Sequence, residues 1–207
     1  MTEQLAALLS EIRACRHCAD SPKGRPLPHE PRPVLRASAT ARLCICGQAP
    51  GTRVHGSGVP FDDPSGVRLR EWLGVGEEEF YDESRIAIIP MGFCFPGLDA
   101  KGGDLPPRKE CAPLWHDQLF GLLPRIELLV LVGQYAQKWH LGRRRKPSLT
   151  QTVMAWREFA SAPSGRMPAI PLPHPSWRNN AWLKRNTWFE EEVLPHLRGE
   201  VSRLLGR

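Results

Sequence analysis

The stretch that decides the fold is Leu43-Cys44-Ile45-Cys46-Gly47-Gln48-Ala49-Pro50-Gly51, an apolar run that ends in a turn rich in glycine and proline. A short, wholly apolar run is typical of a strand that is buried on both faces, as in parallel sheets. Three further apolar runs follow at residues 86–90, 126–132 and 169–172, with helical patterns between them. Strands that alternate with helices form a parallel sheet covered on both faces. We therefore predict a three-layer α/β/α sandwich with a central four-stranded parallel sheet.

Apolar positions spaced three and four residues apart predict the helices around this sheet. The first helix covers about residues 4–14 and carries an apolar face of Leu5, Leu8, Leu9 and Ile12. Further helices are expected after Ser65-Gly66, over residues 107–123 behind prolines, after Gly133, and over residues 186–205 with an interruption at Pro195.

Length and composition set the outer bounds. The 207 residues can bury one sizeable core, and no Ser/Gly-rich linker divides them, so we expect a single domain over residues 1–207. Within it, residues 1–20 are expected to hold an N-terminal helix and the first two of six cysteines. An apolar stretch of about 18 residues and a signal peptide are both missing from the sequence, and we therefore expect a soluble, cytoplasmic protein without membrane contact.

The charge of the chain allows a polyanionic partner. The net charge is +6 and the pI is about 9.2, which permits such a partner without identifying it. Two basic groups flanked by tryptophans are more informative. One is residues 143–146 beside Trp139, and the other is Arg178, Lys184 and Arg185 beside Trp177 and Trp182. Because bases stack on aromatic rings while Lys and Arg meet phosphates, these groups are typical of a nucleic-acid surface. A solvated basic loop is the alternative for either group.

A second short motif, His174-Pro175-Ser176, follows the last apolar run, as residues 47–51 follow the first. Ligands of such sheets bind at the carboxyl ends of the strands, where both motifs fall. In this order, the pair resembles the uracil-DNA glycosylase superfamily, in which the two motifs meet over a base flipped out of DNA. The resemblance covers about residues 15–197. It implies a monofunctional enzyme that hydrolyses the N-glycosidic bond of uracil in DNA and so starts base excision repair.

The resemblance also gives the two motifs their roles. It places the backbone of Gln48 and Ala49 against the uracil, and it makes His174 a hydrogen-bond donor to uracil O2. Uracil leaves as an N1 anion whose charge is shared with O2, so a donor at O2 lowers the cost of that charge. Many relatives carry an aspartate at the position of Ala49 to hold the attacking water. A carboxylate for this purpose must therefore come from elsewhere or be absent.

Residues 58–66 resemble the segment in which these glycosylases place a stacking phenylalanine and, in the broad-specificity family 5 enzymes, a catalytic aspartate. On this match Phe61 lies on the flipped base, and Asp63 assists the water or stabilises the oxocarbenium-like sugar. Asp62 is the alternative because the spacing differs by one residue, and Asp63 is equally suited to capping a helix. Residues 57–75 also resemble the single-strand-selective uracil glycosylases.

Residues other than His174 are also expected to recognise the base and the DNA. Many relatives read uracil with an asparagine at the end of the second strand, but residues 89–93 contain no amide side chain here. Backbone groups, Asn179 or Asn180 are expected to replace it. His55 is the only other histidine that we keep as a possible pocket residue. The residues expected to contact DNA, by filling the space of the flipped nucleotide or by binding phosphates, are Ser176, Trp177, Arg178, Lys184 and Arg185.

The cysteines supply a further signal. Cys15 and Cys18 form a C-x-x-C motif, and Cys94 and Cys111 follow the second and precede the third apolar run. This layout resembles the iron–sulfur uracil glycosylases of family 4 and implies a [4Fe–4S] cluster held by four thiolates, whereas spacing alone also permits tetrahedral zinc. The two remaining cysteines, Cys44 and Cys46, are expected to be buried as small apolar side chains.

The partners follow from the resemblance: uracil-containing DNA, no obligatory protein partner and a monomer that associates with the nucleoid when it acts. Residues 95–110 contain no histidine, so the covalent trapping of abasic DNA that some iron–sulfur relatives perform is not expected. A rival function from another class is a catalytically weak module that binds lesions or abasic DNA in the same pocket. A metal-bearing RNA-binding protein is a more distant rival.

Overall fold

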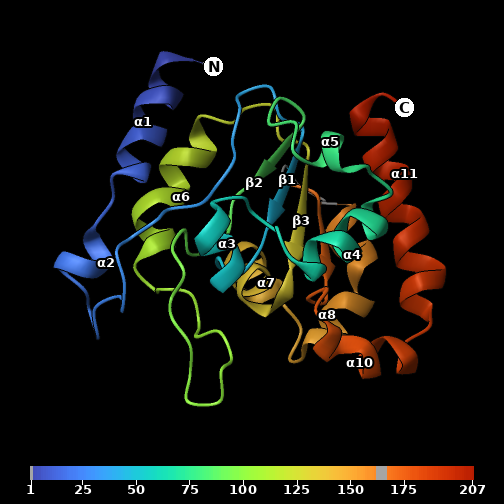
Figure 1. Cartoon of the computed structure of the whole chain (residues 1–207). Coiled ribbons are helices and arrows are strands. Elements are labelled where there is room, and N and C mark those ends of the chain that lie inside the picture. The colour runs from blue at the N-terminus through green and yellow to red at the C-terminus, as the bar shows by residue number, and fades with distance from the viewer. Residues whose placement is uncertain (1, 162–166) are drawn as a thin grey trace.

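The computed structural model describes residues 2–161 and 167–207, and its centre is a sheet of four parallel strands (Figure 1). The strands are β1 (Leu43–Cys46), β2 (Ile86–Ile88), β3 (Leu128–Val132) and β4 (Ala169–Leu172). They are ordered β2-β1-β3-β4, and every neighbouring pair is parallel. All four strands are buried along their whole length, as the apolar runs predicted.

Helices and helical turns connect the strands. They are α1 (Glu3–Arg13), α2 (His17–Asp20), α3 (Thr52–Ser57), α4 (Pro64–Leu73), α5 (Glu77–Phe80), α6 (Cys111–Gly121), α7 (Gly133–Leu141), η1 (Gly142–Arg144), α8 (Leu149–Met154), α9 (Trp156–Ala160), η2 (Trp177–Asn179), α10 (Asn180–Arg185), the π-helical η3 (Phe189–Val193) and α11 (Leu194–Leu205). Within the described part of the chain, none of these helices combines the length and the apolarity needed to cross a membrane.

The alternation of side chains along each strand divides the interior into two cores. Cys44, Cys46 and Leu131 point to the face covered by α1, α6 and α7. Leu43 and Ile45 point to the opposite face, which is covered by α4, α5, η3 and α11. Figure 1 shows α1 and α6 on one side of the sheet and α4 and α11 on the other. The predicted three-layer α/β/α arrangement is therefore confirmed.

Several element boundaries differ from the prediction for local reasons. Helix α6 begins at Cys111, four residues later than predicted. The predicted closing helix over residues 186–205 is formed by η3 and by α11, which follows it directly. Pro195 lies in the first turn of α11, next to the π-helical η3. The short helices α2, α3, α5, α8 and α9 lack a long apolar period and were not predicted.

Candidate active-site pocket

A pocket of about 390 Å³ lies at the carboxyl ends of β1, β2 and β4. Residues 47–51 and His174 line it together, so the two motifs meet as their place at the carboxyl ends of parallel strands predicted. Residues 60–65, the end of β2 with the loop after it, and Val34 also line it. The pocket is therefore assembled from five separate parts of the chain.

The turn after β1 is held in place by backbone hydrogen bonds to the segment that follows β2. The N–H of Met91 donates to the carbonyl of Gly47 at 3.0 Å, and the N–H of Gly92 donates to the carbonyl of Gln48 at 3.0 Å. The side-chain amide of Gln48 donates to the carbonyl of Leu105 at 3.4 Å. The carbonyl and the side chain of Gln48 are thus both engaged with the segment after β2, and Gln48 and Ala49 line the pocket.

Phe61 occupies one side of the pocket in a strained conformation. Its φ is +56°, the only positive value among the described residues other than glycine, and such backbone strain clusters at functional sites. The ring lies against Gly47, where an added Cβ would be 3.2 Å from Cζ. Gly66 permits the conformation, since a Cβ there would lie 1.8 Å from the carbonyl oxygen of Phe61. Two glycines therefore let a flat aromatic surface sit beside the end of β1.

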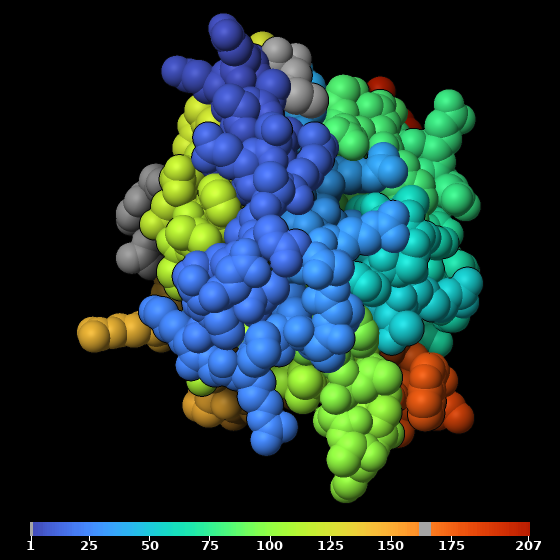
Figure 2. All heavy atoms as spheres, turned by 60° about the vertical axis from the view of Figure 1, so that its left-hand side comes forward, coloured from blue at the N-terminus to red at the C-terminus, as the bar shows by residue number. Residues whose placement is uncertain are grey.

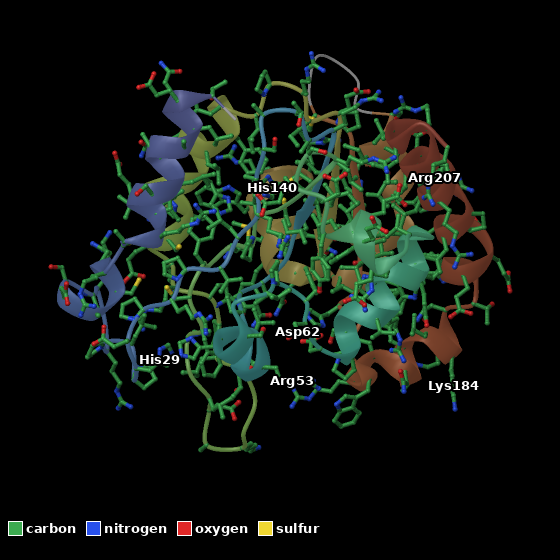
Figure 3. The ribbon with its side chains drawn as sticks, turned by 45° about the horizontal axis from the view of Figure 1, so that its top comes forward. His29, Arg53, Asp62, His140, Lys184 and Arg207 are labelled. Carbon is green, nitrogen blue, oxygen red and sulfur yellow. The ribbon has the colours of Figure 1, made fainter. Side chains whose placement is uncertain are left out.

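The structure distinguishes the two adjacent aspartates. Asp63 lines the pocket and also caps α4, with its Oδ1 accepting the N–H of Gly66 at 3.0 Å. Asp62 is exposed on the segment between α3 and α4 (Figure 3) and is not among the residues that line the pocket. Asp63 therefore caps α4 and lines the pocket at the same time.

The protonation of His174 follows from its hydrogen bond. The backbone N–H of Ser176 donates to Nδ1 of His174 at 3.2 Å, and because an N–H can only donate, Nδ1 is an acceptor. In the neutral ring the proton then resides on Nε2. Burial lowers the pKa of His174, and the nearby charge of Asp63 opposes this shift. His174 therefore offers a neutral N–H donor to the pocket.

Two side chains fix the loop that carries His174. Nδ2 of Asn179 donates to the carbonyl of His174 at 2.7 Å, so its amide nitrogen is already engaged although Asn179 lines the pocket. Nη1 of Arg68, on α4, donates to the carbonyl of Ser176 at 3.3 Å and to Oδ1 of Asn180 at 2.8 Å. Arg68 was not predicted, because nothing near it in the sequence indicates a contact with a loop so distant along the chain.

The end of β2 contributes an apolar wall. Ile88, the last residue of β2, and Pro90 line the pocket. Asp104 was missed. It lines the pocket from the loop between β2 and α6, and no motif around it in the sequence indicates this position. His55 does not line the pocket, because its ring packs on His29 with the centroids 4.1 Å apart.

The two predicted basic groups lie in different places. Arg178 lines the pocket, Trp177 beside it is 72% exposed, and Lys184 at the end of α10 points away from the protein (Figure 3). Arg143 and Arg144 instead border a separate cavity whose lining includes Leu129 and Ala169, from the first halves of β3 and β4. The two basic groups therefore lie beside different cavities.

The four cysteines named for a metal centre border one small cavity. Figure 2 shows the N-terminal segment that carries Cys15 and Cys18 lying beside α6, where Cys111 begins the helix. The N–H of Phe93 donates to Sγ of Cys111 at 3.3 Å, and burial raises the pKa of Cys94 to about 12. Among residues 2–161 and 167–207, no group of three or more His, Cys, Asp or Glu side chains is arranged to hold a single metal ion.

The other two cysteines behave as predicted from their position in the first apolar run. Cys44 and Cys46 are wholly buried on the same face of β1, with their sulfur atoms 3.7 Å apart.

A comparison with protein families gives one match to this architecture. The family model described as the uracil DNA glycosylase superfamily matches residues 36–198, which is most of the chain. The matched span contains the turn after β1, Phe61, Asp63 and His174. It begins after Cys15 and Cys18, so the match does not extend to the N-terminal half of the four-cysteine arrangement.

Proposed function

From the premise that this chain belongs to the uracil-DNA glycosylase superfamily, we propose that it is a monofunctional uracil-DNA glycosylase that starts base excision repair. The superfamily consists of DNA glycosylases, which are hydrolases acting on DNA, and the finer assignment to uracil is the proposal. The observation that carries it is the neutral His174, whose Nδ1 accepts a backbone N–H and whose Nε2–H remains as a donor in the pocket.

The proposed chemistry uses three side chains of the pocket. Phe61 stacks on a uracil flipped out of the DNA, and base–aromatic stacking contributes about 1–3 kcal/mol. The Nε2–H of His174 donates to uracil O2 and stabilises the departing N1 anion. The carboxylate of Asp63 stabilises the positive charge that develops on the sugar as the bond to the base breaks.

The assay that tests this function separates excision from binding. Purified protein is incubated with a single-uracil oligonucleotide, single- or double-stranded, and the product is treated with alkali, which cleaves the DNA only where a base has been lost. We expect cleavage at the uracil and intact DNA when thymine replaces it. The apolar wall of Ile88 and Pro90 favours one alternative, a protein that binds lesions without excising them. Tight binding without alkali-sensitive product would establish that alternative.

We also propose that the phosphate path runs over Arg178, Lys184 and Arg185. Reversing the charge of Lys184 and Arg185 should weaken DNA binding on every sequence alike and reduce its salt dependence, because each neutralised phosphate releases counterions. The matched control reverses Arg143 and Arg144, which border the separate cavity. Fluorescence anisotropy at several salt concentrations measures the DNA affinity of both double variants. An equal loss in both would mean that net charge, rather than a defined path, governs binding.

We further propose that Cys15, Cys18, Cys94 and Cys111 hold a [4Fe–4S] cluster. Their common cavity and the N–H donated to Cys111 support this, because thiolate-bound clusters are held by four cysteines and tuned by hydrogen bonds to sulfur. Such a cluster would tie the segment after α1 to the loop after β2 and to α6. Its role in this proposal is structural.

A further inference from the structure

The loop between β2 and α6 contains a hairpin that holds its own shape beside the pocket. The N–H of Asp99 donates to the carbonyl of Gly103 at 2.7 Å, and the N–H of Leu105 donates to the carbonyl of Gly97 at 2.9 Å. Oδ1 of Asp99 accepts the N–H groups of Lys101 and Gly103 at 2.8 and 2.9 Å. Figure 1 shows this hairpin projecting past the carboxyl edge of the sheet, next to α3.

Asp104 stands at the base of this hairpin, with its carboxylate against the turn after β1. A Cβ added to Gly51 would lie 3.3 Å from Oδ2 and 3.8 Å from Oδ1 of Asp104, so the glycine permits the close approach. The neighbouring Ala49 has no polar side chain. The turn after β1 has no carboxylate of its own at this place, and Asp104 supplies one. Asp104 lies on the rim of the same pocket as Asp63 and His174.

The surroundings of Asp104 and Asp63 differ. Asp104 is exposed at the rim of the pocket, where partial removal from water raises its pKa, and the negative charges of Asp63 and Asp99 raise it further, against the opposing effect of Arg178. Asp63 has one oxygen committed to the N–H of Gly66. Among the described residues Asp104 has no such hydrogen bond to a helix, and a carboxylate with a raised pKa is suited to accept a proton. The pocket thus contains two carboxylates in environments fit for two different tasks.

We propose that Asp104 is the general base for the attacking water. The inference rests on the proposed glycosylase function. In the step it describes, the C1′–N1 bond breaks and its electron pair leaves with uracil. The water oxygen forms a bond to C1′, and the proton that this water loses passes to the carboxylate of Asp104. Asp63 keeps its negative charge and faces the developing sugar cation.

The test compares two aspartates of the same hairpin under single-turnover conditions. Asp104→Asn should slow uracil excision by about 10²-fold, the lower end of what a positioned general base contributes, with DNA binding retained. Asp99→Asn is the matched control. It removes the same charge, keeps an oxygen that can accept the two backbone N–H groups, and alters a residue outside the pocket lining. Its excision rate should fall far less than that of Asp104→Asn, because Asp99 acts on Asp104 only through its charge.

A second variant separates chemistry from loop structure. Asp104→Gly should lose activity, and added formate should restore part of it, because a small carboxylate can occupy the vacated place and accept the proton. Rescue is expected only for this variant. If the wild type excises uracil while Asp104→Asn excises equally fast, or if Asp104→Gly is slow and formate has no effect, the general-base role is overturned and the proposed function stands. If the wild type itself excises no uracil, the proposed function fails and this inference fails with it.

Discussion

Replacing His174 with alanine is expected to slow single-turnover excision of uracil by about 10²-fold or more, with DNA binding largely kept. The reason is that the Nε2–H of His174 acts on the charge of the departing base, which exists only once the glycosidic bond is breaking. Removing one preorganised donor to a developing anion typically has an effect of this size. Binding is spared because the intact base carries no such charge.

Two further variants make the result specific. His174→Gln retains a side-chain N–H donor and should recover part of the rate, whereas a purely packing role for the imidazole predicts no recovery. His196→Ala is the matched control, since His196 packs on Trp156, with ring centroids 4.5 Å apart, and is not among the residues that line the pocket. Wild-type excision by His174→Ala would refute the leaving-group role and leave the chemistry to the carboxylates and the main chain.

The second large effect is expected at the cysteines. If a [4Fe–4S] cluster is present, the protein should be brown, with broad absorbance near ~400 nm, and Cys111→Ala should lose both the colour and most of the soluble yield. The loss of yield follows because the cluster would join the segment after α1 to the start of α6. Iron and acid-labile sulfide analysis of anaerobically purified protein provides the measurement.

The control for this experiment is a cysteine outside the four. Cys44 is wholly buried in β1, and Cys44→Ser should lower the free energy of unfolding without changing the colour or the iron content. A colourless anaerobic preparation that contains stoichiometric zinc would contradict the iron assignment. Full colour in Cys111→Ala would contradict the ligand assignment instead.

The sheet and the meeting of the two motifs could be predicted from the sequence. Strands β1 and β4 have the predicted bounds because a strand buried on both faces must be apolar throughout. The parallel direction then brings the turn after β1 and His174 to one edge. The helix face of Leu5, Leu8, Leu9 and Ile12 is likewise confirmed, since all four side chains are buried. These features depend on residues close together in the chain.

The choice between Asp62 and Asp63 required the structure. The alignment of residues 58–66 with the related segment is uncertain by one residue. The sequence cannot resolve it, because positions 62 and 63 are both aspartate. The N–H of Gly66 at 3.0 Å from Oδ1 fixes Asp63 as the cap of α4 and so turns it toward the pocket. A backbone hydrogen bond of this kind depends on where the helix begins, which sequence patterns define only to within a few residues.

What the sequence by itself determined is the fold class and the pairing of two strand-end motifs, because hydrophobic periodicity and strand direction are local properties that propagate to the whole sheet. Only the tertiary structure decided that Asp104 lines the pocket with His174, that Arg68 holds the His174 loop, and that Arg143 and Arg144 border a different cavity from Arg178. Contacts of this kind come from loops and helix ends. Their positions depend on how separate segments pack against one another, and no pattern within either segment records that packing.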